Sequence, residues 1–231
     1  MDNKWLSALL LLTIQTASAK DNDDPFMWLE DVQGDKSMEW VKTQNAISEG
    51  ELSQSKFYKD LHAQTLEIIN SKDKIKYATI RGNKVYNFWR DDKNIRGLYR
   101  EATLNDYLAN KPQWEVVLDI DKLGKDEGES WVFKGMSCLF PDHEKCLVFL
   151  SRGGADAKVI REYNLTKREF VTDGFRLPEA KSRVSWKDEN TLYVGTDFGD
   201  GSLTKSGYPR ITKLWKRGTP LEQAPLVRNL Q

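Results

Sequence analysis

The sequence predicts a mainly β protein: a partial β-propeller of about three four-stranded antiparallel blades, preceded by a short two-helix leader. Two observations predict this fold. From residue 75 onward, short apolar strands alternate with turns rich in Gly, Pro, Asn and Asp, which favours antiparallel meanders over β-α-β units. The strands recur in sets of four with a repeat of roughly 45 residues, as propeller blades do. A β-sandwich, whose strands also alternate and turn often, is the alternative.

Each predicted blade is a set of four short strands. The predicted strands cover residues 75–80, 84–89, 97–103 and 114–119 in the first blade, 131–140, 146–152, 158–163 and 168–171 in the second, and 183–186, 190–195, 210–215 and 224–227 in the third. Gly153 and Gly154 interrupt the second blade and predict a tight reversal between two strands. Together the blades occupy residues 74–231.

Residues 20–73 predict the helical leader. Asp35 is the expected N-cap of a first helix, with Met38, Val41 and Asn45 along one side. A second helix is expected over residues 55–70. Its apolar stripe at helical spacing consists of Tyr58, Leu61, Thr65, Ile68 and Ile69.

The first 19 residues predict a signal peptide. Lys4 supplies a positive charge, residues 6–14 form an apolar run, and Ala17-Ser18-Ala19 is a small-residue cleavage site. The apolar run is too short to span a bilayer. We therefore expect cleavage after Ala19 and a periplasmic or secreted mature chain.

Two cysteines, Cys138 and Cys146, flank the predicted turn at residues 141–145. In an oxidising compartment they either form a disulfide across the hairpin or remain buried thiols on separate strand faces. We favour the thiols, because cross-strand pairs often miss the Cα spacing that a disulfide needs. Asn164 begins an Asn-Leu-Thr glycosylation sequon, which has meaning only in a eukaryotic source.

The charges of the chain balance. It contains 35 Lys and Arg and 35 Asp and Glu residues, so no long-range field attracts nucleic acid or an anionic membrane. Hydrophobic residues make up 39%, with 8 Trp, which is typical of a globular protein. We expect no nucleic-acid partner, and no membrane contact after the signal peptide is removed.

The sequence predicts no catalytic residue. No Gly-x-Ser-x-Gly motif occurs, and the two histidines are His62, expected on the second helix, and His143, expected in a solvated turn. Catalytic roles are rare among such residues. Nothing in the sequence therefore indicates an activated nucleophile.

No metal or cofactor site is predicted either. Cys138, His143 and Cys146 lack a fourth ligand nearby. Residues 197–201 are rich in oxygen ligands but lack the later Glu of a calcium loop, so we interpret them as a glycine-rich turn. Residues 151–155 lack the Gly-Lys-Ser/Thr ending of a phosphate loop.

Several blocks of the sequence resemble the amino-terminal half of the prolyl oligopeptidase family of serine peptidases (family S9), in its exported bacterial branch. The first is Asp24-Pro-Phe-Met-Trp-Leu-Glu-Asp31, and Ser206-Gly-Tyr-Pro-Arg210 is among the last. The others are residues 39–45, 86–91, 96–100, 114–119, 151–156, 195–199 and 215–221. Because the blocks keep the family's order over nearly the whole mature chain, they are more specific than any single motif.

The resemblance implies a seven-bladed propeller placed over an α/β-hydrolase domain. In the family the propeller restricts entry to short peptides, the helical leader packs on the hydrolase domain, and many members cleave after proline. The Ser-Asp-His triad lies in the carboxy-terminal domain, beyond the blocks matched here. No catalytic, cofactor or metal residue therefore carries over, and we expect this chain alone to be inactive.

The sequence leaves three functions open. The first is the amino-terminal fragment of an exported prolyl-oligopeptidase-like peptidase, with the propeller as substrate gate and no cofactor. The alternative is a non-enzymatic exported propeller-type binding module; an unrelated small β protein ranks last. An arc of three blades leaves apolar faces uncovered at its two ends, so we expect association through the exposed blade edges.

Overall fold

The computed structural model describes residues 24–71, 73 and 77–229. The chain divides into two compact units at Thr65, and each unit is described by itself. The predicted signal peptide and the start of the first predicted strand lie outside the described residues. The predicted domain boundary at residue 73 stays a prediction.

The first unit contains the predicted helices. A 3-10 helix, Met27–Glu30, precedes α1 (Asp35–Leu52), and α2 (Lys56–Asn70) begins in this unit and continues past Thr65. The N-cap of α1 is Gly34, not Asp35 as predicted. The Ser37 hydroxyl donates to the Trp28 carbonyl (2.8 Å), which ties α1 to the 3-10 helix. None of the described helices is long and apolar enough to cross a bilayer.

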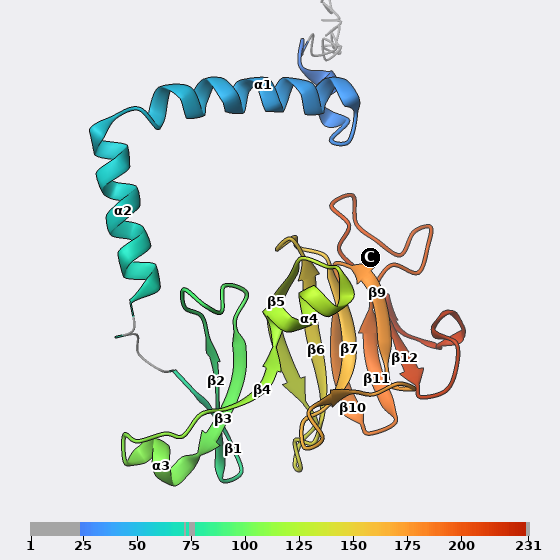
Figure 1. The fold of residues 1–231 in the computed structure, drawn as a ribbon. Helices are drawn as coiled ribbons and strands as arrows, with labels where there is room; N and C mark the ends of the chain where they lie inside the picture. The colour runs from blue at the N-terminus through green and yellow to red at the C-terminus, as the bar shows by residue number, and fades with distance from the viewer. Residues whose placement is uncertain (1–23, 72, 74–76, 230–231) are drawn as a thin grey trace, which may run out of the picture. The chain divides into compact units, whose positions relative to one another are not determined.

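The second unit consists of three antiparallel sheets with few helices (Figure 1). Sheet 1 contains β1 (Thr79–Arg81), β2 (Lys84–Trp89), β3 (Leu98–Thr103) and β4 (Glu115–Asp119). Sheet 2 contains β5 (Trp131–Cys138), β6 (Lys145–Arg152), β7 (Lys158–Asn164), β8 (Glu169–Phe170) and β9 (Arg176–Ala180). Sheet 3 contains β10 (Arg183–Asp188), β11 (Thr191–Gly195), β12 (Ile211–Lys216) and β13 (Leu226–Asn229). The mainly β prediction is confirmed.

Four elements were not among the predicted strands of the blades. Sheet 2 has five strands and not four, because β8 is only two residues long and β9 also pairs with β7. Two short helices, α3 (Leu104–Leu108) and α4 (Ile120–Glu127), follow β3 and β4. Asp119 caps α4 by accepting from the Lys122 N–H (2.9 Å), and Gly128 ends it in the left-handed region, at φ 67°. A short 3-10 helix, Leu221–Gln223, precedes β13.

The predicted reversal at Gly153 and Gly154 is confirmed. Both residues have positive φ, 60° and 94°, a region that glycine enters without steric cost. The Gly153 N–H donates to the Ser130 carbonyl (2.8 Å), and the chain then returns as β7. The reversal places Arg152 and Asp156 at the same end of sheet 2.

Sheets 1 and 2 share the first apolar core. The strands alternate, so that Tyr86, Phe88 and Tyr99 of sheet 1 lie on the same core as Phe133 of sheet 2. The Phe88 and Phe133 rings stack at 4.8 Å between centroids. The Tyr163 hydroxyl donates to the Val117 carbonyl (2.6 Å) within this core, so its one polar group is satisfied.

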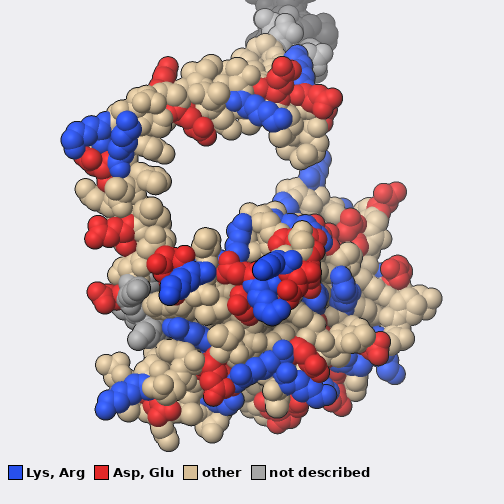
Figure 2. Space-filling model, in the orientation of Figure 1, with Lys and Arg blue, Asp and Glu red and all other residues tan. Residues whose placement is uncertain are grey.

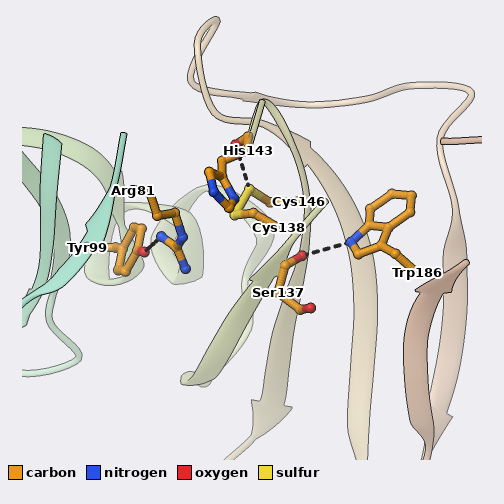
Figure 3. Close-up of a disulfide and its surroundings, with 7 residues drawn as sticks. All are labelled: Arg81, Tyr99, Ser137, Cys138, His143, Cys146 and Trp186. Carbon is orange, nitrogen blue, oxygen red and sulfur yellow. Dashed lines mark hydrogen bonds between the residues drawn. A yellow bond between two sulfur atoms is a disulfide. The ribbon is translucent and has the colours of Figure 1, made fainter. Parts of the chain in front are cut away.

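Sheets 2 and 3 share the second core. Leu147, Ile160 and Leu177 of sheet 2 and Leu192 and Val194 of sheet 3 are fully buried there. The Phe175 and Trp215 rings meet edge to face at 4.9 Å. The Trp186 indole N–H donates to the Ser137 carbonyl (3.0 Å), which joins β10 to β5 (Figure 3).

A buried glutamate pairs with an arginine of the next sheet at both of these interfaces. Glu101 on β3, with 6% of its side chain exposed, binds Arg168 of sheet 2 (3.0 Å) and Lys84 of its own sheet. Glu162 on β7, with 2% exposed, binds Arg217 of sheet 3 through both carboxylate oxygens (2.7 and 3.0 Å). A buried carboxylate is tolerated only when it is paired and hydrogen-bonded, so these pairs fix neighbouring sheets against each other.

Cys138 and Cys146 form a disulfide, so our preference for free thiols is wrong (Figure 3). The two residues are direct register partners on β5 and β6, with their Cα atoms 3.9 Å apart. The hydrogen bond between the two strands is formed by the neighbouring pair, Leu139 and Lys145: the Leu139 N–H donates to the Lys145 carbonyl (2.8 Å). The cysteines are therefore a non-hydrogen-bonded pair, where the strands approach most closely.

We expect loss of this disulfide to destabilise the second unit. It closes a short loop, with eight residues of sequence separation, and loop-closure entropy gives about 2.5 kcal/mol of stabilisation for such a loop. Urea unfolding with and without a reductant measures the difference. The double variant Cys138→Ala/Cys146→Ala is the control and should be insensitive to reductant. Equal stability of the oxidised and reduced wild-type chain would contradict the expectation.

Glu101 makes the stability of the sheets depend on pH. Burial raises the pKa of its carboxyl, but hydrogen bonds from Lys84, Arg168 and Tyr86 outweigh burial and lower the pKa below its ordinary value. The pair therefore stabilises the folded chain above the unfolded pKa of about 4.3. This stabilisation is lost as the pH falls through the folded pKa.

We expect Glu101→Gln to destabilise the chain near pH 7 and to have a smaller effect as the pH falls below about 4. The free energies of unfolding of the wild type and of Glu101→Gln, measured between pH 3 and 7, give the effect of the substitution at each pH. Glu51→Gln, at an exposed position of α1, is the matched control. It should leave the free energy of unfolding unchanged both near pH 7 and below about pH 4. A constant effect of Glu101→Gln at every pH would show that the carboxylate charge is unimportant.

Candidate functional site

The two histidines lie in a helix and in a turn. His62 lies on α2, as predicted, and stacks on Tyr58 with ring centroids 6.1 Å apart. His143 lies in the β5–β6 turn at φ 57°, but it is half-buried and not solvated as predicted. Its Nδ1 is buried without a hydrogen-bond partner among the described residues. Among the residues that the structure describes, neither histidine forms a hydrogen bond with a serine or a carboxylate.

The motifs weighed as metal or phosphate sites have local structural roles. Cys138 and Cys146 are joined to each other, so their sulfurs are not thiolate ligands. Asp197 accepts from the Gly199 N–H (2.9 Å), which makes residues 197–201 the expected glycine-rich turn. Within the described ranges, no group of three His, Cys, Asp or Glu residues is placed to hold a metal ion.

A cluster of polar side chains joins sheets 2 and 3 at the end where β6 reverses. The Tyr208 hydroxyl, from the loop between β11 and β12, donates to the Asp156 carboxylate. The Lys181 ammonium lies 3.4 Å from the same carboxylate, donates to the Ser206 carbonyl (2.8 Å) and sits 4.5 Å from the centre of the Tyr208 ring. Asp156 and Tyr208 come from two of the sequence blocks described above, which the fold brings together.

The electrostatics of this cluster favour the charged carboxylate. The Tyr208 hydrogen bond is the main reason that the pKa of Asp156 is lowered, and the Lys181 charge acts in the same direction. The same bond raises the pKa of Tyr208. At neutral pH, Asp156 is therefore an anion and Tyr208 a neutral donor. These contacts hold the loops in position relative to each other.

Sheet 2 also carries a charged cavity of about 740 Å³ at this end, beside α4. Arg152 binds Glu129 (2.8 Å) on one side and Glu179 (2.8 Å) on the other. Arg161 binds Glu127 (2.7 Å), which also accepts from the Trp131 indole (2.8 Å). Basic and acidic side chains are intermixed over the visible face of the sheets, without one dominant sign (Figure 2).

Sequence reasoning missed this cavity. In the sequence, Arg152 only precedes the reversal at Gly153 and Gly154, and its partners Glu129 and Glu179 lie 23 and 27 residues away. The pKa of Glu129 is lowered mainly by the Arg152 hydrogen bonds, and the pKa of Arg152 is raised by Glu129 and Glu179. One feature of the sequence could have indicated the cavity: the alternation of residues along β6 places Arg152 on the same face of the sheet as Leu150.

Comparison with known proteins decides the family. The model of the prolyl oligopeptidase N-terminal β-propeller domain matches residues 13–230. The chain belongs to this family. Its three sheets are therefore propeller blades, and the sandwich alternative is excluded. The resemblance of the sequence blocks to the amino-terminal half of the prolyl oligopeptidase family is confirmed.

Curated relatives of this propeller segment are peptidases. An uncharacterized peptidase, y4nA, of Sinorhizobium fredii is 43% identical over 208 residues, which is 90% of this chain and 29% of the relative. The uncharacterized peptidase RP174 of Rickettsia prowazekii is 32% identical over 94% of this chain and 32% of the relative. The prolyl endopeptidase of Elizabethkingia miricola is 29% identical over 88% of this chain and 28% of the relative. The propeller segment thus spans about a third of these relatives, or slightly less.

Solved structures agree with the fold. A post-proline cleaving enzyme from Rickettsia typhi superposes with a TM-score of 0.81 at 33% identity, over 90% of this chain and 31% of that one. Oligopeptidase B from Leishmania major superposes with a TM-score of 0.67 at 13% identity, over 89% and 28% of the two chains. The second likeness is one of fold alone.

Proposed function

We propose that this chain is the amino-terminal, substrate-gating part of an exported serine peptidase that hydrolyses short peptides after proline. The observation that carries the proposal is the similarity to the Rickettsia typhi post-proline cleaving enzyme over nearly the whole propeller segment. The prolyl endopeptidase of Elizabethkingia miricola supports the same chemistry. The triad that performs it belongs to the carboxy-terminal domain that the family resemblance implies.

The packing of the blades supports a gating role. A gate that excludes large substrates must hold its opening while peptides pass. The buried Glu101 and Glu162 pairs and the two aromatic cores make each blade rigid against its neighbour. If neighbouring blades moved apart to widen the opening, those carboxylates would stay buried without partners, which costs free energy. Size selection by a stiff opening is the role that such blades support.

Export is the third part of the proposal. It rests on the charge, apolar run and cleavage site within residues 1–19. The Cys138–Cys146 disulfide is in keeping with it, because disulfides persist in oxidising compartments and are rare in the cytosol. Amino-terminal sequencing of the protein from a periplasmic or culture fraction should begin at Lys20. Recovery of an uncleaved chain from the cytosol alone would contradict export.

We expect the purified chain of residues 20–231 not to hydrolyse a proline-containing chromogenic peptide. The reason is chemical: in the described residues, no histidine hydrogen-bonds a serine or a carboxylate. Release of p-nitroaniline measures turnover, and buffer provides the baseline. Turnover that survives purification would contradict the assignment of catalysis to a separate domain.

The nucleotide sequence beyond codon 231 separates the proposal from the non-enzymatic binding module. The peptidase proposal requires a downstream frame that encodes Gly-x-Ser-x-Gly followed by an Asp and a His. A clean stop followed by unrelated sequence would instead favour the binding module.

A further inference from the structure

Two groups of opposite net charge line the charged cavity of sheet 2. The first contains Arg161, Glu127 and Arg176. Arg176 on β9 lies directly opposite Arg161 on β7, and like charges in that position repel each other. Glu127 binds Arg161 and the Trp131 indole, and among the described residues no carboxylate pairs with Arg176. This group therefore has one uncompensated positive charge.

The second group contains Arg152, Glu129 and Glu179. One guanidinium serves two carboxylates, with both contacts at 2.8 Å. The group therefore has one excess negative charge. Because Glu129 and Glu179 retain oxygens with free lone pairs, the group can accept further hydrogen bonds from a cation.

Buried residues lie beneath the two charged groups and fix their positions. Trp131, Val159 and Leu177 are 3%, 6% and 0% exposed, and the Arg152 guanidinium covers the Trp131 ring at 4.9 Å from its centre, so a ligand meets the charged groups. The volume of about 740 Å³ lies within the range of pockets that enclose small ligands, roughly 300 to 1,000 Å³. The matching ligand carries a carboxylate at one end and an ammonium group at the other.

We propose that this cavity binds a short peptide with free termini. The terminal carboxylate binds Arg176 and Arg161 and relieves their repulsion. The terminal ammonium group binds Glu129 and Glu179. The site is built from sheet 2 and α4 alone, so binding requires neither peptidase activity nor another domain.

The test uses four forms of the tripeptide Ala-Leu-Ala: free, N-acetylated, C-amidated and blocked at both ends. Isothermal titration calorimetry measures their affinities for the chain of residues 20–231. We expect each single block to weaken binding by about threefold to tenfold, and both blocks together by the product of the two factors. Each block removes one charge-assisted contact and leaves the rest of the peptide unchanged.

Two variants assign each end of the peptide to its group. Arg176→Gln should reduce the effect of amidation, because only Arg161 remains to bind the carboxylate, and should keep the effect of acetylation. Glu179→Gln should reduce the effect of acetylation, because only Glu129 remains to bind the ammonium group, and should keep the effect of amidation. Arg176 and Glu179 are both exposed, so we expect both variants to fold, and circular dichroism checks this. Arg183→Gln, an exposed arginine on β10 outside the cavity, is the matched control and should behave like the wild type.

Several results would overturn the inference. Equal affinity for all four peptides, or no measurable binding, would exclude a site for peptide termini. An effect of amidation without one of acetylation would reduce the site to a simple carboxylate site. Effects unchanged in Arg176→Gln and Glu179→Gln would place binding elsewhere. None of these results bears on the proposed peptidase function, which is tested by the downstream reading frame and by turnover.

Discussion

The arrangement of the three sheets depends on two carboxylates that are buried where sheets meet. Glu101 and Glu162 are almost inaccessible, and each receives an arginine from the following sheet. The two pairs occupy equivalent places: each glutamate lies two residues before the end of the third strand of its sheet, and each arginine lies in the turn after the third strand of the next. Apolar cores supply most of the attraction between sheets. The ion pairs set the register, because a displaced sheet would leave a buried charge without a partner.

This constraint also positions the surface features that carry the functional argument. The reversal at Gly153 and Gly154 projects from strands whose other residues are locked into both cores. Asp156 therefore meets Tyr208 and Lys181 of the neighbouring loops, and Arg152 meets Glu129 and Glu179. A rigid scaffold that presents polar loops at one end is a common basis for binding sites. Here it places both the loop cluster and the charged cavity.

Local patterns predicted most of the fold, and the failures have physical causes. Alternating apolar residues located the strands because each core is built from one face of a sheet. Strand β9 was missed because Pro178 lies within it, and proline usually excludes a strand. The disulfide was misjudged because it depends on Cys138 and Cys146 being register partners of the non-hydrogen-bonded kind, which composition does not reveal. The ion pairs between sheets could not be predicted for a similar reason, since Arg168 and Arg217 lie 67 and 55 residues from their glutamates in the sequence.

The most direct test of this account is a double-mutant cycle on Glu162 and Arg217. Urea unfolding of the wild type, Glu162→Gln, Arg217→Met and the double variant gives the coupling energy between the two side chains. If the pair joins sheets 2 and 3, each single change costs about 3 kcal/mol and the coupling is about 2 kcal/mol. Additive effects, with a coupling near zero, would contradict the central claim that buried charge pairing holds neighbouring blades in register.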